Sequence, residues 1–176
     1  MFIPGIIISA LTFPGVIVHE LAHQLYCRAL KVPVFKVVYF QMENPVGYVL
    51  HEKPKSLLHS ALICLGPFMI NTLLGFLIAL PSAIQYNLGA GMNILDYAMV
   101  YLGVSIAMHA FPSTGDASAL WQAAKEDDRP WFTKVIVLPI IGFIYLGALG
   151  SFFWLDLIYG IAIAVGLPWM VLQWAA

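Results

Sequence analysis

The sequence predicts an all-α polytopic membrane protein with about five transmembrane helices and a small β-hairpin between the first two. Of its 176 residues, 61% are apolar and 10% are charged, whereas a soluble domain is about 45 to 50% apolar and about 25% charged. The charges also leave long gaps: Lys, Arg, Asp and Glu are absent from 1–19, 56–95, 97–115, 135–155 and 157–176. A net charge of −1 and two cysteines exclude a broad basic surface for nucleic acid and a disulfide-stapled secreted domain.

A helix that spans a bilayer needs about 20 mostly apolar residues. The uncharged stretches therefore predict transmembrane helices over 2–28, 57–80, 93–112, 132–150 and 152–173. Four or six spans remain open, because Gly147, Gly150 and Ser151 fit either a tight hairpin turn or small residues packed within a broken helix. The first stretch lacks the basic region of a signal peptide, so we expect it to remain in the mature protein.

We expect one membrane-embedded domain over residues 1–176, with a core at about 1–125 and additional transmembrane helices at about 131–176. Segments 32–41 and 46–51 are rich in Val, Phe and Tyr, and Glu43, Asn44 and Pro45 between them have turn chemistry. This connection predicts a β-hairpin. Segment 117–125 predicts a short helix.

The basic residues predict an orientation. All eight lie around the first and third connections between helices: Arg28, Lys31, Lys36, Lys53, Lys55, Lys125, Arg129 and Lys134. By the positive-inside rule these connections are cytoplasmic, and the N-terminus is outside. The C-terminal ends of the first and third helices then lie on the same, cytoplasmic side.

The first predicted helix contains the motif His-Glu-x-x-His at His19, Glu20 and His23. Positions i and i+4 are about 6 Å apart along a helix and about 40° apart around it, so both imidazoles can bind one metal. Glu20 points about 100° away from His19 and is better placed to act on a water than to bind the metal. Polar groups at the end of an apolar span are costly without a partner or function, which favours a metal site over an inert polar face.

A hydrolytic zinc needs a third protein ligand. The best candidate is Asp116, an isolated carboxylate after Pro112 and Gly115, with a helix N-cap as its alternative role. His51, Glu52 and His59 remain possible ligands at the same level. Asp96 and Asp156 are expected near the outer ends of their helices, too far away in depth.

The order of these features resembles the site-2 protease family of intramembrane zinc metalloproteases. After His-Glu-x-x-His come a β-rich connection, then Gly66-Pro67-x-x-x-Asn71 near the start of the second helix, then a Pro-containing loop that ends at Asp116. The resemblance covers about residues 10–125. It implies a three-helix catalytic core and cleavage of peptide bonds within or beside the membrane.

Matched residue by residue, the resemblance implies one zinc per chain, with His19, His23 and Asp116 as ligands and Glu20 as the general base for a zinc-activated water. This chain has Gly115-Asp116-Ala117 where the family usually has Leu-Asp-Gly. It also has His109 where the family commonly has an Asn. His109 therefore has two possible roles, a substrate contact or a packed helix residue.

Two further roles concern substrate binding. Asn71 is a candidate contact, although an interhelical hydrogen bond explains it better. The segment from Gly47 to Leu50, including Tyr48 and Val49, or the facing strand, is expected to pair with an unwound substrate. The expected partners are a membrane protein or peptide substrate and the lipid bilayer. A metal-handling or transport protein, or an inactive relative that binds membrane partners, are the alternatives.

Overall fold

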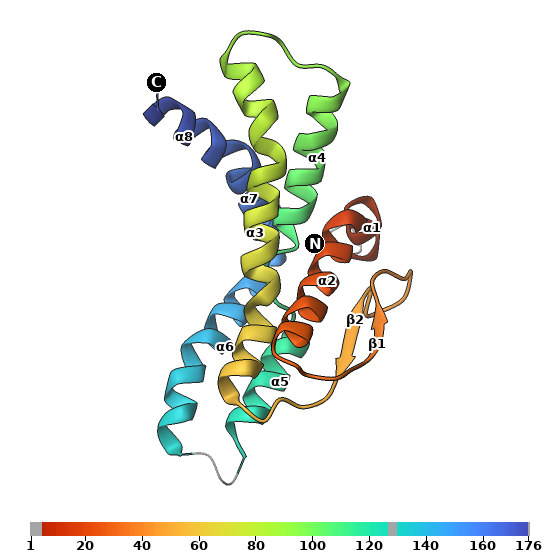
Figure 1. The fold of residues 1–176 in the computed structure, drawn as a ribbon, viewed down its shortest axis with the longest axis vertical. Coiled ribbons are helices and arrows are strands. Elements are labelled where there is room, and N and C mark those ends of the chain that lie inside the picture. Colours follow the sequence, from red (N-terminus) through yellow and green to blue (C-terminus); the bar gives the residue numbers. More distant parts are fainter. Residues whose placement is uncertain (1–4, 127–129, 176) are drawn as a thin grey trace.

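The computed structural model describes residues 5–126 and 130–175, which form a helical body with a two-stranded hairpin on one side (Figure 1). The long helix α3 (Leu57–Asn87) runs along the centre. Helix α4 (Ile94–Met108) packs beside one half of α3, and α5 (Thr114–Ala124) continues along the other half. Helix α2 (Phe13–Ala29) packs against both α3 and α4. The predicted helical class is confirmed.

Three helical segments are long and apolar enough to cross a membrane: α3, α6 (Trp131–Ser151) and the segment Leu155–Trp174. There are four if the bent pair α1 and α2 forms one span. These segments are typical of an integral membrane protein. The count of five spans is not confirmed, because α4 has 15 residues and is shorter than a full span.

The first predicted helix is broken. Instead of one helix over 2–28, the structure has α1 (Gly5–Leu11) and α2, which meet at an angle of 89° around Thr12. Pro14 lies in the first turn of α2, where its missing N–H costs nothing. The Thr12 hydroxyl donates to the Ile8 carbonyl at 2.7 Å, and its oxygen lies 2.7 Å from Nε2 of His109. A contact with α4 thus holds the break in place.

The predicted hairpin is confirmed. Strands β1 (Val34–Val38) and β2 (Tyr48–His51) pair antiparallel, with Val37 opposite Val49 and Val38 opposite Tyr48. The hairpin packs against α2. It therefore lies beside the helix that carries the His-Glu-x-x-His motif.

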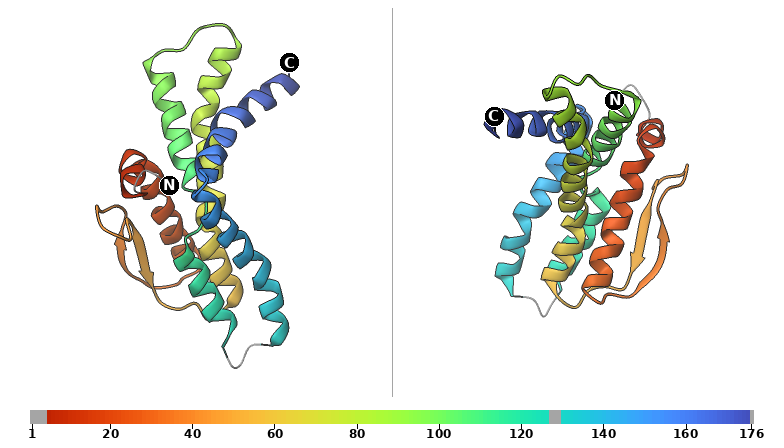
Figure 2. Two further views of the ribbon diagram at one scale, coloured as in Figure 1. Left: turned by 180° about the vertical axis from the view of Figure 1, so that it is seen from behind. Right: turned by 45° about the horizontal axis from the view of Figure 1, so that its top comes forward.

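The end of the chain is a broken helix and not a hairpin. Helix α6 and helix α7 (Leu155–Ile161) follow one another in the same direction along the long axis (Figures 1 and 2). Between them the chain makes a tight turn at Phe152–Trp154, and Trp154 has a positive φ of 63°. A five-residue π-helical segment, η1 (Ala162–Gly166), then leads into α8 (Leu167–Ala175), which points away from the body.

Helices α3 and α4 approach closely through small residues. A Cβ atom at Gly75 would lie 2.7 Å from Cβ of Ala107 and 2.8 Å from the carbonyl oxygen of Gly103. Such contacts let helix backbones pack tightly inside a membrane. This close packing fixes the end of α4, which supplies part of the site described below.

Candidate metal centre

Two histidines on α2 are oriented by backbone carbonyls of other helices. Nδ1 of His19 lies 2.7 Å from the His109 carbonyl oxygen, and Nδ1 of His23 lies 2.9 Å from the Ile63 carbonyl oxygen. Because a carbonyl only accepts, each Nδ1 must donate, so Nε2 of each neutral ring carries the lone pair. Carbonyls in this position fix the orientation of metal-binding histidines.

Asp116 completes the group from α5. Its Oδ2 accepts from the N–H and the hydroxyl of Ser113, both at 2.7 Å, in the capping box that begins α5. Its Oδ1 lies 3.4 Å from Nε2 of His23. The two roles that the sequence left open are therefore compatible, since each oxygen serves one of them. Burial opposes ionisation of this carboxyl, but the positive charge of a protonated His23 and the Ser113 hydrogen bond outweigh burial and hold its pKa below the usual range. A metal ion between the two side chains would take the place of that proton.

The spacing of these atoms fits a metal ion. Nε2 of His19 and Nε2 of His23 lie 3.2 Å apart, and the three ligand atoms, with Oδ1 of Asp116, all lie within 4.8 Å of one another. Ligands about 2.0 to 2.1 Å from a tetrahedral zinc are about 3.3 Å apart. Two lone pairs and a carboxylate that converge in this way repel one another unless a cation lies between them. The donor set of two imidazoles and one carboxylate suits zinc.

The other proposed ligands lie elsewhere. His51 ends β2, and its Nδ1 lies 2.7 Å from the Glu52 carbonyl oxygen. His59 lies in the first turns of α3. Within residues 5–126 and 130–175, the side chains that could share a metal with His19 and His23 do not include those of His51, Glu52 or His59.

Glu20 lies next to the metal group and beneath the hairpin. It is 7% exposed and lines the same cavity as both histidines. A Cβ atom at Gly47 would lie 2.7 Å from Cγ of Glu20 and 2.9 Å from its Oε1. Only glycine lets the backbone before β2 come this close to the glutamate.

Asn71 and His109 hold the site together. The Asn71 side-chain amide is fully buried and donates to the carbonyls of Gly15, Ile106 and His109 at 3.1 to 3.2 Å. It thus joins α2, α3 and the end of α4, and this agrees with the interhelical role. The His109 carbonyl accepts from both Asn71 and His19, while its ring lies beside Thr12 and lines the cavity.

The site opens into two cavities. The larger, of about 570 Å³, is lined by α2, the hairpin, the ends of α4 and α5, and the break between α6 and α7. The smaller, of about 340 Å³, lies between β2, α3 and α5. Val49, His51, Asp116 and Ala119 line both. Tyr48 and Gly47 line the larger cavity.

Asp156 is the clearest error in the sequence analysis. We expected it near the outer end of its helix, but it lines the larger cavity together with Ser151, His19 and Glu20. The reason is the break between α6 and α7: the chain does not turn back at Ser151, so Asp156 begins α7 halfway along the body. The only sequence feature that could have indicated this position is that Asp156 is a single acidic residue between two uncharged stretches.

Comparisons with protein-family models, curated proteins and solved structures found no match to this chain.

Proposed function

We propose that the protein is an intramembrane zinc metalloprotease of the site-2 protease type, which hydrolyses peptide bonds of membrane-embedded or membrane-adjacent substrates. The observation that carries the proposal is the joint placement of Glu20 and the His19, His23 and Asp116 group in one cavity beneath a β-strand. A metal store or carrier needs ligands. It does not need a buried carboxylate outside the ligand set.

The chemistry follows from the roles of the side chains. Zinc bound at this group would polarise the substrate carbonyl and acidify a water. Glu20 takes the proton of that water and returns it to the leaving amine. His109 and Ile63 act through their carbonyls by fixing the two imidazoles. Gly47 places the hairpin directly against Glu20, which limits the water around it.

The free edge of β2 supports substrate binding by strand addition. The Val46 carbonyl accepts from Gln41 N–H at 2.7 Å, and Glu52 N–H donates to the Pro33 carbonyl at 2.8 Å, so both face the β1 side of the hairpin. Backbone groups alternate along a strand, and Val49 therefore presents its N–H and C=O to the opposite side. That side borders both cavities.

Proline substitutions test strand addition. Val49→Pro removes a donor from the free edge, whereas Tyr48→Pro removes one from the pairing with β1. We expect Val49→Pro to slow cleavage while zinc content and the melting temperature stay close to wild type. Tyr48→Pro should loosen the hairpin itself. Wild-type turnover in both variants would leave the hairpin with a structural role alone.

The decisive test of the proposed function is Glu20→Gln. The purified protein is loaded with zinc and mixed with single-span peptides in detergent or proteoliposomes. We expect one zinc per chain in both forms and hydrolysis in the wild type alone, because the base is not a ligand. Full activity in Glu20→Gln would refute the proposal. Tight zinc binding without hydrolysis by the wild type would favour a metal-handling protein or an inactive relative.

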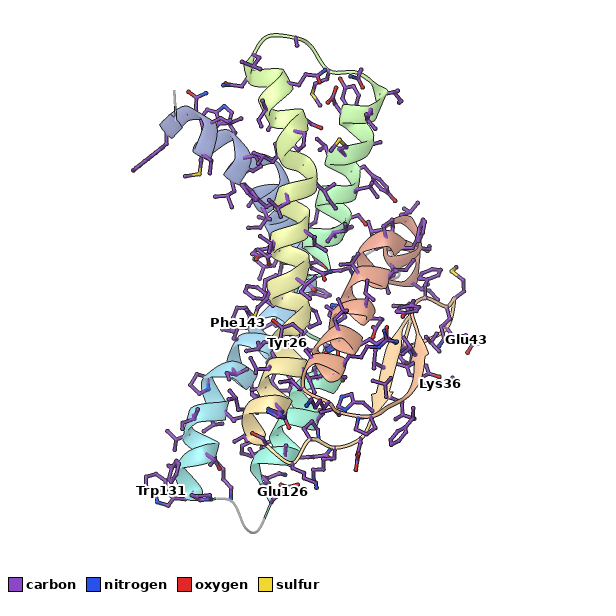
Figure 3. The ribbon with its side chains drawn as sticks, in the orientation of Figure 1. Tyr26, Lys36, Glu43, Glu126, Trp131 and Phe143 are labelled. Atoms are coloured by element: carbon purple, nitrogen blue, oxygen red, sulfur yellow. The ribbon has the colours of Figure 1, made fainter. Side chains whose placement is uncertain are left out.

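We further propose that the N-terminus is outside and that the metal centre lies near the cytoplasmic face. The end of the body that bears Glu126 and Trp131 (Figure 3) also carries Lys125 and Lys134 in the adjoining helix ends, as the positive-inside rule requires of a cytoplasmic face. Leu88, after α3, is 76% exposed and suits a labelling test. A cysteine at position 88, in a background without Cys27 and Cys64, should react only from outside. Labelling only from the cytoplasm would invert the orientation.

A further inference from the structure

The segment after residue 134 carries one charged side chain. Residues 135–155 and 157–176 contain no Lys, Arg, Asp or Glu, so Asp156 is the one charged side chain in the apolar stretch from α6 to α8. An ionisable side chain in such a stretch costs free energy unless it has a partner or a function. The metal centre does not account for it, because Asp156 is not among the side chains that converge there.

The break between α6 and α7 turns Asp156 toward the larger cavity. Ser151, the last residue of α6, donates from its hydroxyl to Oδ2 of Asp156 at 3.2 Å. Oδ1 accepts from the N–H of Leu157 at 2.9 Å. Both Ser151 and Asp156 line the cavity that contains His19 and Glu20. The neighbouring aromatic residues Phe152 and Phe153 are more than half exposed and cover the outside of the turn.

The charges along this cavity are unbalanced. Its described lining residues include the carboxylates of Glu20, Asp116 and Asp156, and no Lys or Arg. A divalent metal between His19, His23 and Asp116 would offset the charge near the metal centre. The charge of Asp156, which lies on a different helix from these ligands, would still attract a cation from within the cavity.

We propose that Asp156, held by Ser151, is a subsite for a basic side chain, Lys or Arg, near the cleaved bond of the substrate. This inference rests on the proposed function, since it assigns the substrate class of the same cavity. A peptide that lies along the free edge of β2 crosses this cavity, and its side chains alternate between the two faces of the strand. A carboxylate in an environment of low polarity attracts an ammonium or guanidinium group and repels a glutamate at the same position.

Alternative roles for Asp156 explain less of the arrangement. A metal ion would need further ligands, and within the described ranges no other metal-ligating side chains gather around Asp156. The N–H of Leu157 accounts for one oxygen of the carboxylate. It does not account for the position of the carboxylate and the Ser151 hydroxyl on the cavity wall.

The experiment uses the zinc-loaded full chain and single-span peptides that are identical except for one residue. Lys, Gln or Glu is placed in turn at each of the positions around the cleaved bond, and kcat/KM is measured for each peptide. The variants are Asp156→Asn, Asp156→Lys and Asp156→Glu. The matched control is Glu43→Gln, which removes the same charge from the exposed tip of the hairpin (Figure 3). Binding of the uncleaved peptides to Glu20→Gln is measured in parallel.

At one position we expect the wild type to prefer Lys to Glu by at least about tenfold, the equivalent of about 1.4 kcal/mol. Asp156→Asn should lose this preference, Asp156→Lys should reverse it, and Asp156→Glu and Glu43→Gln should keep it. Equal rates for Lys and Glu peptides in the wild type at every position would overturn the inference while the proposed function stands. A preference that survives in Asp156→Asn would do the same.

Two further outcomes are also decisive. If Asp156→Asn does not fold, Asp156→Lys decides the matter, with Asp156→Glu as its control: a Lys preference that is unchanged in Asp156→Lys would overturn the inference. If the wild type cleaves no peptide, the proposed function fails, and the binding measurement alone tests the subsite. A Lys peptide that binds Glu20→Gln no more tightly than a Glu peptide would then overturn it.

Discussion

Helices α4 and α5 begin with the same local structure, but only α5 places its capping aspartate beside a histidine. In α4, the Asn93 side chain accepts from the N–H of Asp96, and Oδ2 of Asp96 accepts from the N–H of Asn93 at 2.8 Å. In α5, Ser113 and Asp116 form the same reciprocal pair. Only Asp116 also has an oxygen beside a histidine, 3.4 Å from Nε2 of His23.

The comparison shows that the position in the fold decides whether a capping carboxylate could also bind a metal. Both aspartates occupy the third position of their helices and stabilise a helix start in the same way. Asp116 differs because α5 starts beside the histidines of α2, whereas α4 starts at the far end of α3. A carboxylate has two oxygens, so one can serve as the cap while the other faces the metal.

The largest effect on zinc binding should come from His23, the proposed ligand beside Asp116. We expect His23→Ala to abolish stoichiometric zinc binding, because it removes one of three protein ligands and the one nearest to Asp116. His59→Ala is the matched control, and its zinc content should equal that of the wild type. Metal analysis of the purified proteins measures both. Loss of zinc in His59→Ala with retention in His23→Ala would move the site to the start of α3.

The next effect separates the two caps. Asp116→Asn should weaken zinc binding by more than about a hundredfold, since loss of an outer partner alone typically costs about 10- to 100-fold. Asp96→Asn should leave zinc affinity unchanged while it perturbs the same kind of cap. Competition with a zinc-binding dye gives both affinities. Equal zinc affinities in the two variants would show that Asp116 is only a cap.

The smallest effect concerns the residues that precede the aspartates. Ser113→Ala and Asn93→Ala should each lower the free energy of unfolding by about 1 kcal/mol, the usual contribution of an N-cap side chain. Ser113→Ala should also lower zinc affinity by about tenfold, because its hydroxyl orients Asp116. Denaturation in detergent and zinc competition report the two quantities. Reduced zinc affinity in Asn93→Ala would contradict this separation.

Features set by local sequence were predictable. The hairpin follows from two β-prone segments around Glu43, Asn44 and Pro45, and its strands lie within the expected ranges. The two histidines and Glu20 follow from the geometry of one helix turn. Asp116 was identified as an isolated carboxylate after a proline, but the sequence could not separate the cap from the proposed ligand. The fold shows the cap and is compatible with both roles.

Features set by contacts between distant segments were not predictable. The sharp bend at Thr12 depends on the side chain of His109, 97 residues away. The turn at Phe152–Trp154 depends on a left-handed conformation of a tryptophan, a residue that does not favour it. Once that turn is taken as a reversal of the chain, Asp156 is assigned to the wrong depth. A wrong prediction for this one turn therefore places Asp156 away from the cavity that it lines.

The close approach of Gly47 to Glu20 also restricts how the hairpin can form. If β2 slipped by one residue along β1, Val46 or Tyr48 would take the place of Gly47 against the glutamate. Either side chain would collide with Glu20, and every side chain of the strand would also move to the opposite face. The glutamate therefore selects the strand register. A hairpin of this length, which is weakly stable alone, gains a single alignment from the residue that it covers.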